Sequence, residues 1–347
     1  MKELKALVRP NVWRMAPYSC ARDEFEGEAS VYLDANENPW NAPYNRYPDP
    51  MQKQVKERLS VLKGVNQASI FLGNGSDEAI DLVIRAFCEP GLENMITIAP
   101  SYGMYQVCAE VNNVECQQVP LKEGFQLDAD AVLAAVNERT KVIFLCSPNN
   151  PSGNNLDRAS IYRILKEFDG IVVIDEAYID FSSHPSFVKE LADFPNMIVL
   201  QTLSKAWGAA GIRLGMAFAS PEIIGVMNKI KYPYNVNMLT QAKALEFLNK
   251  DDVKEAQVQE ILSERARLEK LFTEAPLSFH VYPSDANFLL VNVDDADALY
   301  KELVKQGIVV RNRNNVMKCQ GCLRITIGTP EENNILLAAL KAWRSEA

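Results

Sequence analysis

Short runs of apolar residues recur along the first two thirds of this chain, and longer amphipathic segments separate them. Runs of this kind predict buried strands, and the segments between them have the 3.6-residue period of helices. Buried strands that alternate with helices predict a parallel-rich sheet covered by helices on both faces. The predicted strands are residues 69–72, 94–98, 114–119, 141–146, 171–174, 197–200 and 215–219.

The pattern changes after Pro221, where the chain becomes mostly helical. Residues 251–274 predict a long amphipathic helix with one apolar face. Beyond it, residues 287–293 and 323–327 alternate like strands, and helical segments accompany them. This second part of the chain predicts a smaller α+β unit, so the expected fold class is α/β with two unequal domains.

The length of 347 residues is long for a single core and favours two tightly associated domains. Residues 1–40 have weak periodicity and many turn-forming residues, which indicates an arm laid over another part of the protein. We therefore expect an N-terminal arm at 1–40 that packs with the small domain, a large domain at 41–250 and a small domain at 251–347.

Composition excludes several classes of function. The formal net charge is -9 and no block of basic residues occurs, which argues against a nucleic-acid groove. The start of the chain lacks the apolar run of a signal peptide, and no stretch has the length of a membrane span, so we expect a cytoplasmic protein.

The seven cysteines are odd in number and scattered, which favours buried free thiols. Cys319 and Cys322 form a single C-x-x-C pair, and the sequence has only two histidines. A structural zinc ion needs four ligands, so we expect no metal site and assign the cysteine pair no role.

The segment from Thr202 to Arg213 carries the strongest candidate chemistry. It follows the predicted strand 197–200, and it contains two hydroxyl residues, Lys205, several small residues and an arginine. A lysine held in a tight turn at the end of a strand suits an amine that forms a covalent bond, although an ordinary exposed lysine is the simpler interpretation. The hydroxyls of Thr202 and Ser204 and the Arg213 guanidinium could hold a phosphate.

Polar residues also follow three other predicted strands. The turn Gly73–Glu78 opens a helix, so its free amides could bind an anion, but it matches neither of the common nucleotide motifs. Asp175 ends an apolar strand, where a carboxylate is costly unless it meets a cation or caps a turn. Asn150 and Tyr178 could hydrogen-bond a phenolate oxygen, although Asn-Pro is also ordinary turn chemistry.

A molecule with an aldehyde, a phosphate, a pyridine nitrogen and a phenolic oxygen needs this set of partners, and pyridoxal 5'-phosphate is such a molecule. The motifs, in this order over nearly the whole chain, resemble those of the fold type I aminotransferases. The resemblance is closest to the histidinol-phosphate aminotransferase family, and it implies a mostly parallel seven-stranded sheet in the large domain. The motifs that carry it are 16–18, 36–39, 46–48, 101–105, 147–153, 202–205 and 322–326.

The resemblance implies a role for each matching residue. Lys205 would form the Schiff base with the cofactor and move protons, and Asp175 would pair with the ring nitrogen so that the ring acts as an electron sink. Asn150 and Tyr178 would bind the phenolic oxygen, and Tyr102 would stack on the ring. The implied phosphate ligands are Ser76, Asp77, Thr202, Ser204 and Arg213, together with Tyr47 from the neighbouring subunit of a homodimer.

The resemblance also implies the substrates, which are histidinol phosphate and 2-oxoglutarate, with imidazole-acetol phosphate and L-glutamate as products. Arg324, which we expect to begin a strand of the small domain, would bind the substrate phosphate with Arg311 and Tyr18, and Asn36 would lie near them. Arg311 could instead be a surface arginine. Two alternatives stay open on the same scaffold, an aminotransferase for aromatic amino acids and a threonine-phosphate decarboxylase, besides a regulatory protein with a decayed site.

Overall fold

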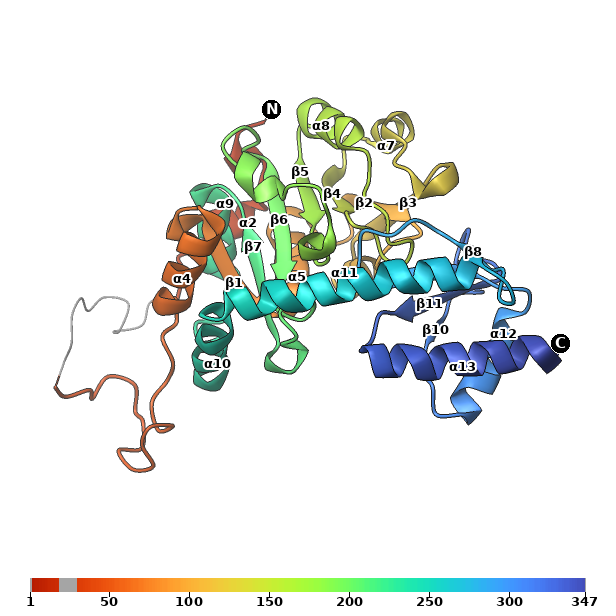
Figure 1. Cartoon of the computed structure of the whole chain (residues 1–347). Coiled ribbons are helices and arrows are strands. Elements are labelled where there is room, and N and C mark those ends of the chain that lie inside the picture. Colours follow the sequence, from red (N-terminus) through yellow and green to blue (C-terminus); the bar gives the residue numbers. More distant parts are fainter. Residues whose placement is uncertain (1, 19–29, 347) are drawn as a thin grey trace.

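The computed structural model describes residues 2–18 and 30–346, and it contains two sheets (Figure 1). The larger sheet has seven strands in the order β1-β7-β6-β5-β4-β2-β3, with parallel pairing from β6 through β3. Only β7 is antiparallel to its neighbours, β1 and β6. The strands are β1 (Ile70–Asn74), β2 (Asn94–Ala99), β3 (Glu115–Pro120), β4 (Thr140–Cys146), β5 (Ile171–Asp175), β6 (Met197–Thr202) and β7 (Leu214–Phe218).

Helices cover both faces of this sheet because its strands are apolar on both sides. In β5, Val172 and Ile174 belong to one buried cluster, while Ile171 and Val173 belong to the cluster on the opposite face. The first cluster includes residues of α4 (Lys53–Lys63), α7 (Ala129–Ala135), α8 (Arg158–Glu167) and α10 (Met238–Leu248). The second includes residues of α1 (Leu4–Leu7), α2 (Pro10–Arg14), α5 (Gly75–Phe87), α6 (Met104–Val111) and α9 (Pro221–Ile230).

The smaller sheet has four antiparallel strands in the order β10-β11-β9-β8. It packs with α11, α12 and α13 around a separate apolar cluster that includes Leu268, Phe272 and Leu340. The elements are β8 (His280–Val281), β9 (Phe288–Asn292), β10 (Arg311–Asn312), β11 (Cys322–Thr326), α11 (Asp251–Thr273), α12 (Ala296–Lys305) and α13 (Pro330–Glu346). The short 3-10 helices are Gln67–Ser69, Glu123–Phe125, Ile179–Phe181, Phe187–Glu190 and Ala210–Ile212.

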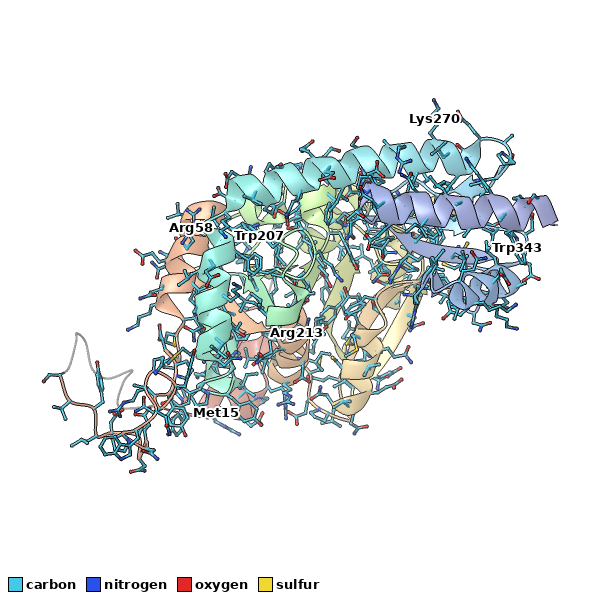
Figure 2. All side chains as sticks on the ribbon, turned by 60° about the horizontal axis from the view of Figure 1, so that its bottom comes forward. Met15, Arg58, Trp207, Arg213, Lys270 and Trp343 are labelled. Carbon is cyan, nitrogen blue, oxygen red and sulfur yellow. The ribbon has the colours of Figure 1, made fainter. Side chains whose placement is uncertain are left out.

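Helix α11 connects the two sheets. Its Val258 packs with Tyr178 and Ala206 beside the large sheet, whereas Phe272 near its other end belongs to the small sheet's core. Figure 2 shows this helix running from the side of Trp207 to Lys270, next to the helix that carries Trp343. A continuous helix with apolar contacts at both ends fixes the two units against each other across the cavity described below.

The seven-stranded, mostly parallel sheet predicted from the sequence is confirmed, and each predicted strand corresponds to an observed one. The predicted packing of the N-terminal arm is wrong for its first helices. Leu7 and Val12 belong to the same buried cluster as Phe71 of the large sheet, and α2 contacts α9 of the large domain. Farther along, Leu33 and Trp40 are largely exposed, and this segment extends away from both sheets in Figure 1.

The described helices include no candidate for a membrane span. Among residues 2–18 and 30–346, no helix combines the length and apolar content needed to cross a bilayer. Cys319 and Cys322, the C-x-x-C pair, are both buried free thiols, and Cys322 is the first residue of β11.

We predict that Gly215 in β7 is required for folding. A Cβ at this position would lie 2.0 Å from the Ser76 amide nitrogen, where α5 begins. Gly215→Ala should therefore lower the free energy of unfolding by about 3 kcal/mol, measured by urea denaturation. Gly225→Ala is the matched control, since a Cβ there meets nothing within 4 Å in the interior of α9. Its helical propensity should raise stability by about 0.5–1 kcal/mol, and equal effects of the two changes would contradict the prediction.

Candidate active site

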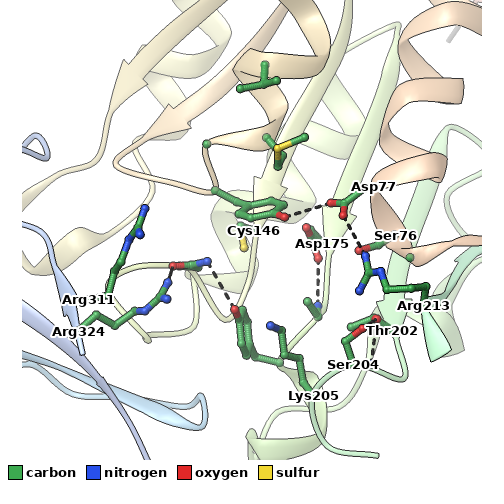
Figure 3. A pocket seen from close by; sticks show the side chains of 18 of the residues that line it. Ser76, Asp77, Cys146, Asp175, Thr202, Ser204, Lys205, Arg213, Arg311 and Arg324 are labelled. Atoms are coloured by element: carbon green, nitrogen blue, oxygen red, sulfur yellow. Dashed lines mark hydrogen bonds and ion pairs between the residues drawn. The ribbon is translucent and has the colours of Figure 1, made fainter. Parts of the chain in front are cut away.

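A cavity of about 520 Å³ lies where the strands of the large sheet end, opposite the hairpin of β10 and β11 (Figure 3). Ligands bind at this edge in open α/β sheets because the carboxyl ends of the parallel strands converge there. The lining includes twelve of the fifteen predicted site residues, which are Ser76, Asp77, Tyr102, Asn150, Asp175, Tyr178, Thr202, Ser204, Lys205, Arg213, Arg311 and Arg324.

Lys205 lies in the turn after β6, and the buried residues Leu203, Ala206 and Trp207 hold the backbone of that turn. The Gly208 amide donates to the Lys205 carbonyl (3.0 Å), which closes the turn. The Lys205 ammonium is 5.5 Å from the centre of the Tyr178 ring and points into the cavity (Figure 3). Desolvation, followed by the charge of Arg324, lowers the pKa of Lys205. A larger share of neutral amine favours both nucleophilic attack and proton transfer.

Asp175 ends β5 and is only 2% exposed. Its Oδ2 accepts a hydrogen bond from the Tyr105 hydroxyl (2.6 Å), and its Oδ1 accepts one from the Ala177 amide (3.0 Å). Burial raises the pKa of Asp175, and these two hydrogen bonds and the nearby Lys205 oppose that rise. A carboxylate buried in this way is suited to pair with a cationic group that enters the cavity.

Asn150 connects the two sheets. Its Nδ2 donates to the Tyr178 hydroxyl (3.4 Å), and its Oδ1 accepts from Nη1 of Arg324. We expected Arg324 to begin a strand, but it lies at the centre of β11, and its partner in the β10 register is Arg311. The amide of Asn150 and the phenol of Tyr178 thus present hydrogen-bonding groups next to each other on the cavity wall.

The other end of the cavity has the groups of an anion site. Gly75 has a φ of 71° and begins α5, so the amides at that helix terminus are free of intrahelical partners. The Arg213 Nη2 lies 2.7 Å from where a Cβ at Gly75 would be, which brings the guanidinium against the turn. Thr202 and Ser204 add hydroxyls, and their oxygens are 3.0 Å apart.

Asp77 organises the wall next to this anion site. Its Oδ1 accepts from the Tyr102 hydroxyl (3.1 Å), and its Oδ2 lies 3.4 Å from Nη2 of Arg213. Burial and the charge of Asp77 raise the pKa of Tyr102, so its phenol stays protonated. The hydrogen bond between Tyr102 and Asp77 fixes the Tyr102 side chain at the edge of the space between Asp175 and the turn at Gly75.

Arg313 is a lining residue that our sequence interpretation did not assign to the site. It lies two positions beyond Arg311 in an extended segment, so both side chains leave the same face, which is a signal the sequence contains. Burial and the charges of Arg324 and Arg311 lower the pKa of Arg313 to about 10. Among the described residues, its Nε is buried without a hydrogen-bond partner, and none of these three arginines forms an ion pair with a carboxylate.

Three predicted site residues lie outside the cavity. Tyr18 is 69% exposed, and Asn36 belongs to the segment that extends from the sheets. Tyr47 stacks on Tyr234, with ring centres 4.4 Å apart. The roles assigned to these three residues remain predictions, and that of Tyr47 concerns a second copy of the chain.

The donor set fits pyridoxal 5'-phosphate. The turn at Gly75 with Arg213 matches the phosphate, Asp175 matches a protonated ring nitrogen, and Asn150 with Tyr178 matches the phenolic oxygen. Because position 75 is a glycine, no side chain fills the space next to the Arg213 guanidinium. The lysine amine lies between these groups, which is the placement that an aldehyde requires.

Comparison with known proteins agrees with this geometry. The family model described as aminotransferase class I and II matches residues 31–340. The chain therefore belongs to the class I and II aminotransferases. It is 75% identical to the histidinol-phosphate aminotransferase of Parabacteroides distasonis, over 98% of this chain and 99% of that protein. It is 59% identical to that of Bacteroides fragilis, over 99% of this chain and 100% of that protein. Within its family, the chain groups with the histidinol-phosphate aminotransferases.

Solved structures show the same fold. The histidinol-phosphate aminotransferase of Clostridium acetobutylicum superposes with a TM-score of 0.81 and 25% identity, over 88% of this chain and 92% of that one. The enzyme of Sinorhizobium meliloti, solved in complex with pyridoxal 5'-phosphate, has a TM-score of 0.80 and 24% identity, with 90% of each chain covered.

Glu176 supports the site from behind. It follows Asp175 and is buried, and its carboxylate accepts from the Phe187 amide (2.7 Å), Gln201 Nε2 (2.9 Å) and the Ser186 hydroxyl. Burial raises the pKa of Glu176 to about 7, although these hydrogen bonds oppose the rise. The folded protein therefore binds more protons than the unfolded chain between the ordinary pKa of a glutamate and this raised value.

We predict that this carboxyl group makes the protein less stable as the pH rises to about 7. Because the folded-state pKa is above the unfolded one, the contribution is fully present at low pH and is lost as the group ionises. The difference in unfolding free energy between wild type and Glu176→Gln should fall by about 3 kcal/mol over this interval. Urea denaturation at a series of pH values measures this difference, and a difference that does not change with pH would contradict the assignment.

Proposed function

We propose that this protein catalyses the reversible transfer of an amino group from L-histidinol phosphate to 2-oxoglutarate in histidine biosynthesis, giving imidazole-acetol phosphate and L-glutamate. One observation carries the choice of substrate. The cavity that contains Lys205 is also lined by Arg311, Arg313 and Arg324, three guanidinium groups without carboxylate partners among the described residues. The similarity to named histidinol-phosphate aminotransferases supports the same substrate.

Three positive charges in one place favour a dianion. The phosphate of histidinol phosphate carries nearly two negative charges at neutral pH, whereas an α-carboxylate carries one. Guanidinium groups bind phosphate oxygens in pairs, and their mutual repulsion in the free protein is relieved when such an anion enters. Arg324 and Arg311 are the primary ligands that we propose, with Arg313 beside them and with Tyr18 and Asn36 closing the site.

The cofactor that we propose is pyridoxal 5'-phosphate, which supplies an electron sink for the charge that develops when a proton leaves the substrate's α-carbon. Lys205 would hold its aldehyde carbon and, once released by the substrate, would carry that proton through its neutral amine. Asp175 would keep the ring nitrogen protonated, while Asn150 and Tyr178 would bind the phenolic oxygen. The phosphate ligands would be the Ser76 and Asp77 amides, Thr202, Ser204, Arg213 and Tyr47.

The rest of the proposal concerns assembly. We propose a homodimer in which Tyr47 reaches the phosphate site of the partner, so that each cavity uses both copies. The exposed aromatic residues of the extended segment, Trp40 and Tyr44, favour such a contact. We also propose that this protein is cytoplasmic. In addition to the N-terminal arm, we propose two domains, at 41–250 and 251–347, that enclose the substrates between them.

The function is tested with the purified protein supplied with pyridoxal 5'-phosphate. We expect glutamate to form from histidinol phosphate and 2-oxoglutarate, with the parallel-line kinetics of a ping-pong scheme, and we expect Lys205→Ala to abolish it. Phenylalanine should react with a much lower kcat/KM than histidinol phosphate, and the reverse order would make the protein an aromatic aminotransferase. Carbon dioxide released from phosphothreonine without an oxoacid would instead indicate a decarboxylase.

We predict that Arg313 separates the phosphate substrate from the others. Arg313→Gln should raise the KM for histidinol phosphate about 10- to 100-fold, because a partly buried charge–phosphate interaction is lost. The KM for glutamate in the reverse reaction should change less than about threefold, since each of its carboxylates carries a single charge that Arg324 alone can meet. Steady-state kinetics in both directions gives the two values.

The matched control is Arg163→Gln, which removes an exposed guanidinium of α8 that pairs with Asp130 and Glu167. It should leave both KM values unchanged, and Arg313→Lys should recover part of the loss. An equal rise for both substrates in Arg313→Gln would contradict a role in selecting phosphate.

A further inference from the structure

Tyr105 is the closest partner of the buried carboxylate, although the family motif that contains it suggested no role for it. It lies in α6, its side chain has no exposed surface, and its hydroxyl donates to Asp175 Oδ2 at 2.6 Å. Tyr105 is not among the residues that line the cavity, whereas Asp175 is, so the phenol meets the carboxylate from outside the cavity. It therefore touches neither the substrate site nor the cofactor site directly.

The position of this phenol is fixed by aromatic packing. The Tyr105 ring stacks on Phe144 of β4, with centres 5.0 Å apart and planes at 26°. The edge of Tyr102 meets it at 5.6 Å and 87°. Because the ring has neighbours on both sides and no solvent contact, the hydroxyl has one orientation from which to donate.

The hydrogen bond limits how Asp175 can turn. Within the described part of the chain, each carboxylate oxygen has one donor, Tyr105 for Oδ2 and the Ala177 amide for Oδ1. These two donors fix the carboxylate plane and leave the remaining lone pairs for a group in the cavity. They also stabilise the charged form against burial, and the phenol is the larger of the two contributions. The ionisable groups near Asp175 are Tyr102, Tyr105, Cys146, Asp77, Tyr178 and Lys205.

We propose that Tyr105 is a positioning residue that keeps Asp175 ionised and oriented toward the ring nitrogen of the cofactor. The inference rests on the proposed function, because it needs a cofactor whose ring nitrogen is protonated. Tyr105 acts through Asp175 alone: it takes part in no covalent step and moves no proton. Without its hydroxyl, the carboxylate has a single donor in a buried environment and holds the ring proton less well.

The test is Tyr105→Phe, which removes the hydroxyl and keeps the ring and its packing. We expect kcat to fall about 10- to 100-fold, because a buried charged acceptor loses one of two donors. The KM for either substrate should change less than about threefold. A spectroscopic readout is independent of turnover: the visible absorbance of the bound cofactor should titrate with an apparent pKa higher by about 0.5–1 unit. The reason is that a ring that is less often cationic withdraws fewer electrons, so the nitrogen that would link Lys205 to the cofactor loses its proton less readily.

Three further measurements separate positioning from a structural role. Tyr162→Phe is the matched control, because its hydroxyl binds Arg158 and Glu190 away from the cavity, and it should behave like wild type. In a double-mutant cycle, adding Tyr105→Phe to Asp175→Asn should cost little more than Asp175→Asn alone. Replacing Tyr105 with 3-fluorotyrosine, a stronger donor of nearly the same shape, should move the absorbance pKa the opposite way.

Each outcome decides the question. An unchanged absorbance titration in Tyr105→Phe, or additive effects in the cycle, would overturn the proposal while the protein remains an aminotransferase. If Tyr105→Phe does not fold, the 3-fluorotyrosine protein alone carries the test, and an unshifted titration there overturns it. A wild-type protein that makes no glutamate from histidinol phosphate would overturn the proposed function instead.

Discussion

The structure depends on a carboxylate placed where water hardly reaches. Asp175 ends a wholly buried strand, and an isolated charge there is costly unless donors and a cation surround it. Tyr105 and the Ala177 amide supply the donors, and the cavity leaves the space for the cation. The parallel strands on either side then place the neighbouring site residues, because β4 and β6 end beside β5 and bring Asn150 and Lys205 to the same edge of the sheet.

The small sheet contributes a cluster of positive charges to the cavity at this edge. Arg311 and Arg324 are direct neighbours across the β10–β11 pair, and Arg313 follows on the same face. Guanidinium groups this close repel one another. Burial and this repulsion together lower the pKa values of Arg313 and Arg324. The bond from Arg324 to Asn150 ties this cluster to the large sheet.

Much of this arrangement follows from the sequence because apolar runs identify strands and strand ends identify sites. The apolar runs at 171–174 and 197–200 predict two strands, and Asp175 does end β5 while Lys205 does follow β6. The partner of Asp175 did not follow, because Tyr105 is seventy positions away and only tertiary packing brings them together. The two-residue strands β8 and β10 are too short for any periodicity, and the first two helices join the large sheet's core through apolar residues that no local pattern directs there.

The arginine cluster also bears on how one cavity serves two substrates in turn. In the proposed reaction, histidinol phosphate and then 2-oxoglutarate occupy the same space, and their anionic groups differ in charge and reach. Arg324 is held by Asn150 and by the Phe288 ring, 5.3 Å from its guanidinium carbon, so it offers a fixed ligand to either anion. Arg311 is exposed on a two-residue strand and has rotamer freedom that Arg324 lacks. A fixed arginine beside a mobile one suits a site that binds a doubly charged phosphate group first and a singly charged carboxylate group next.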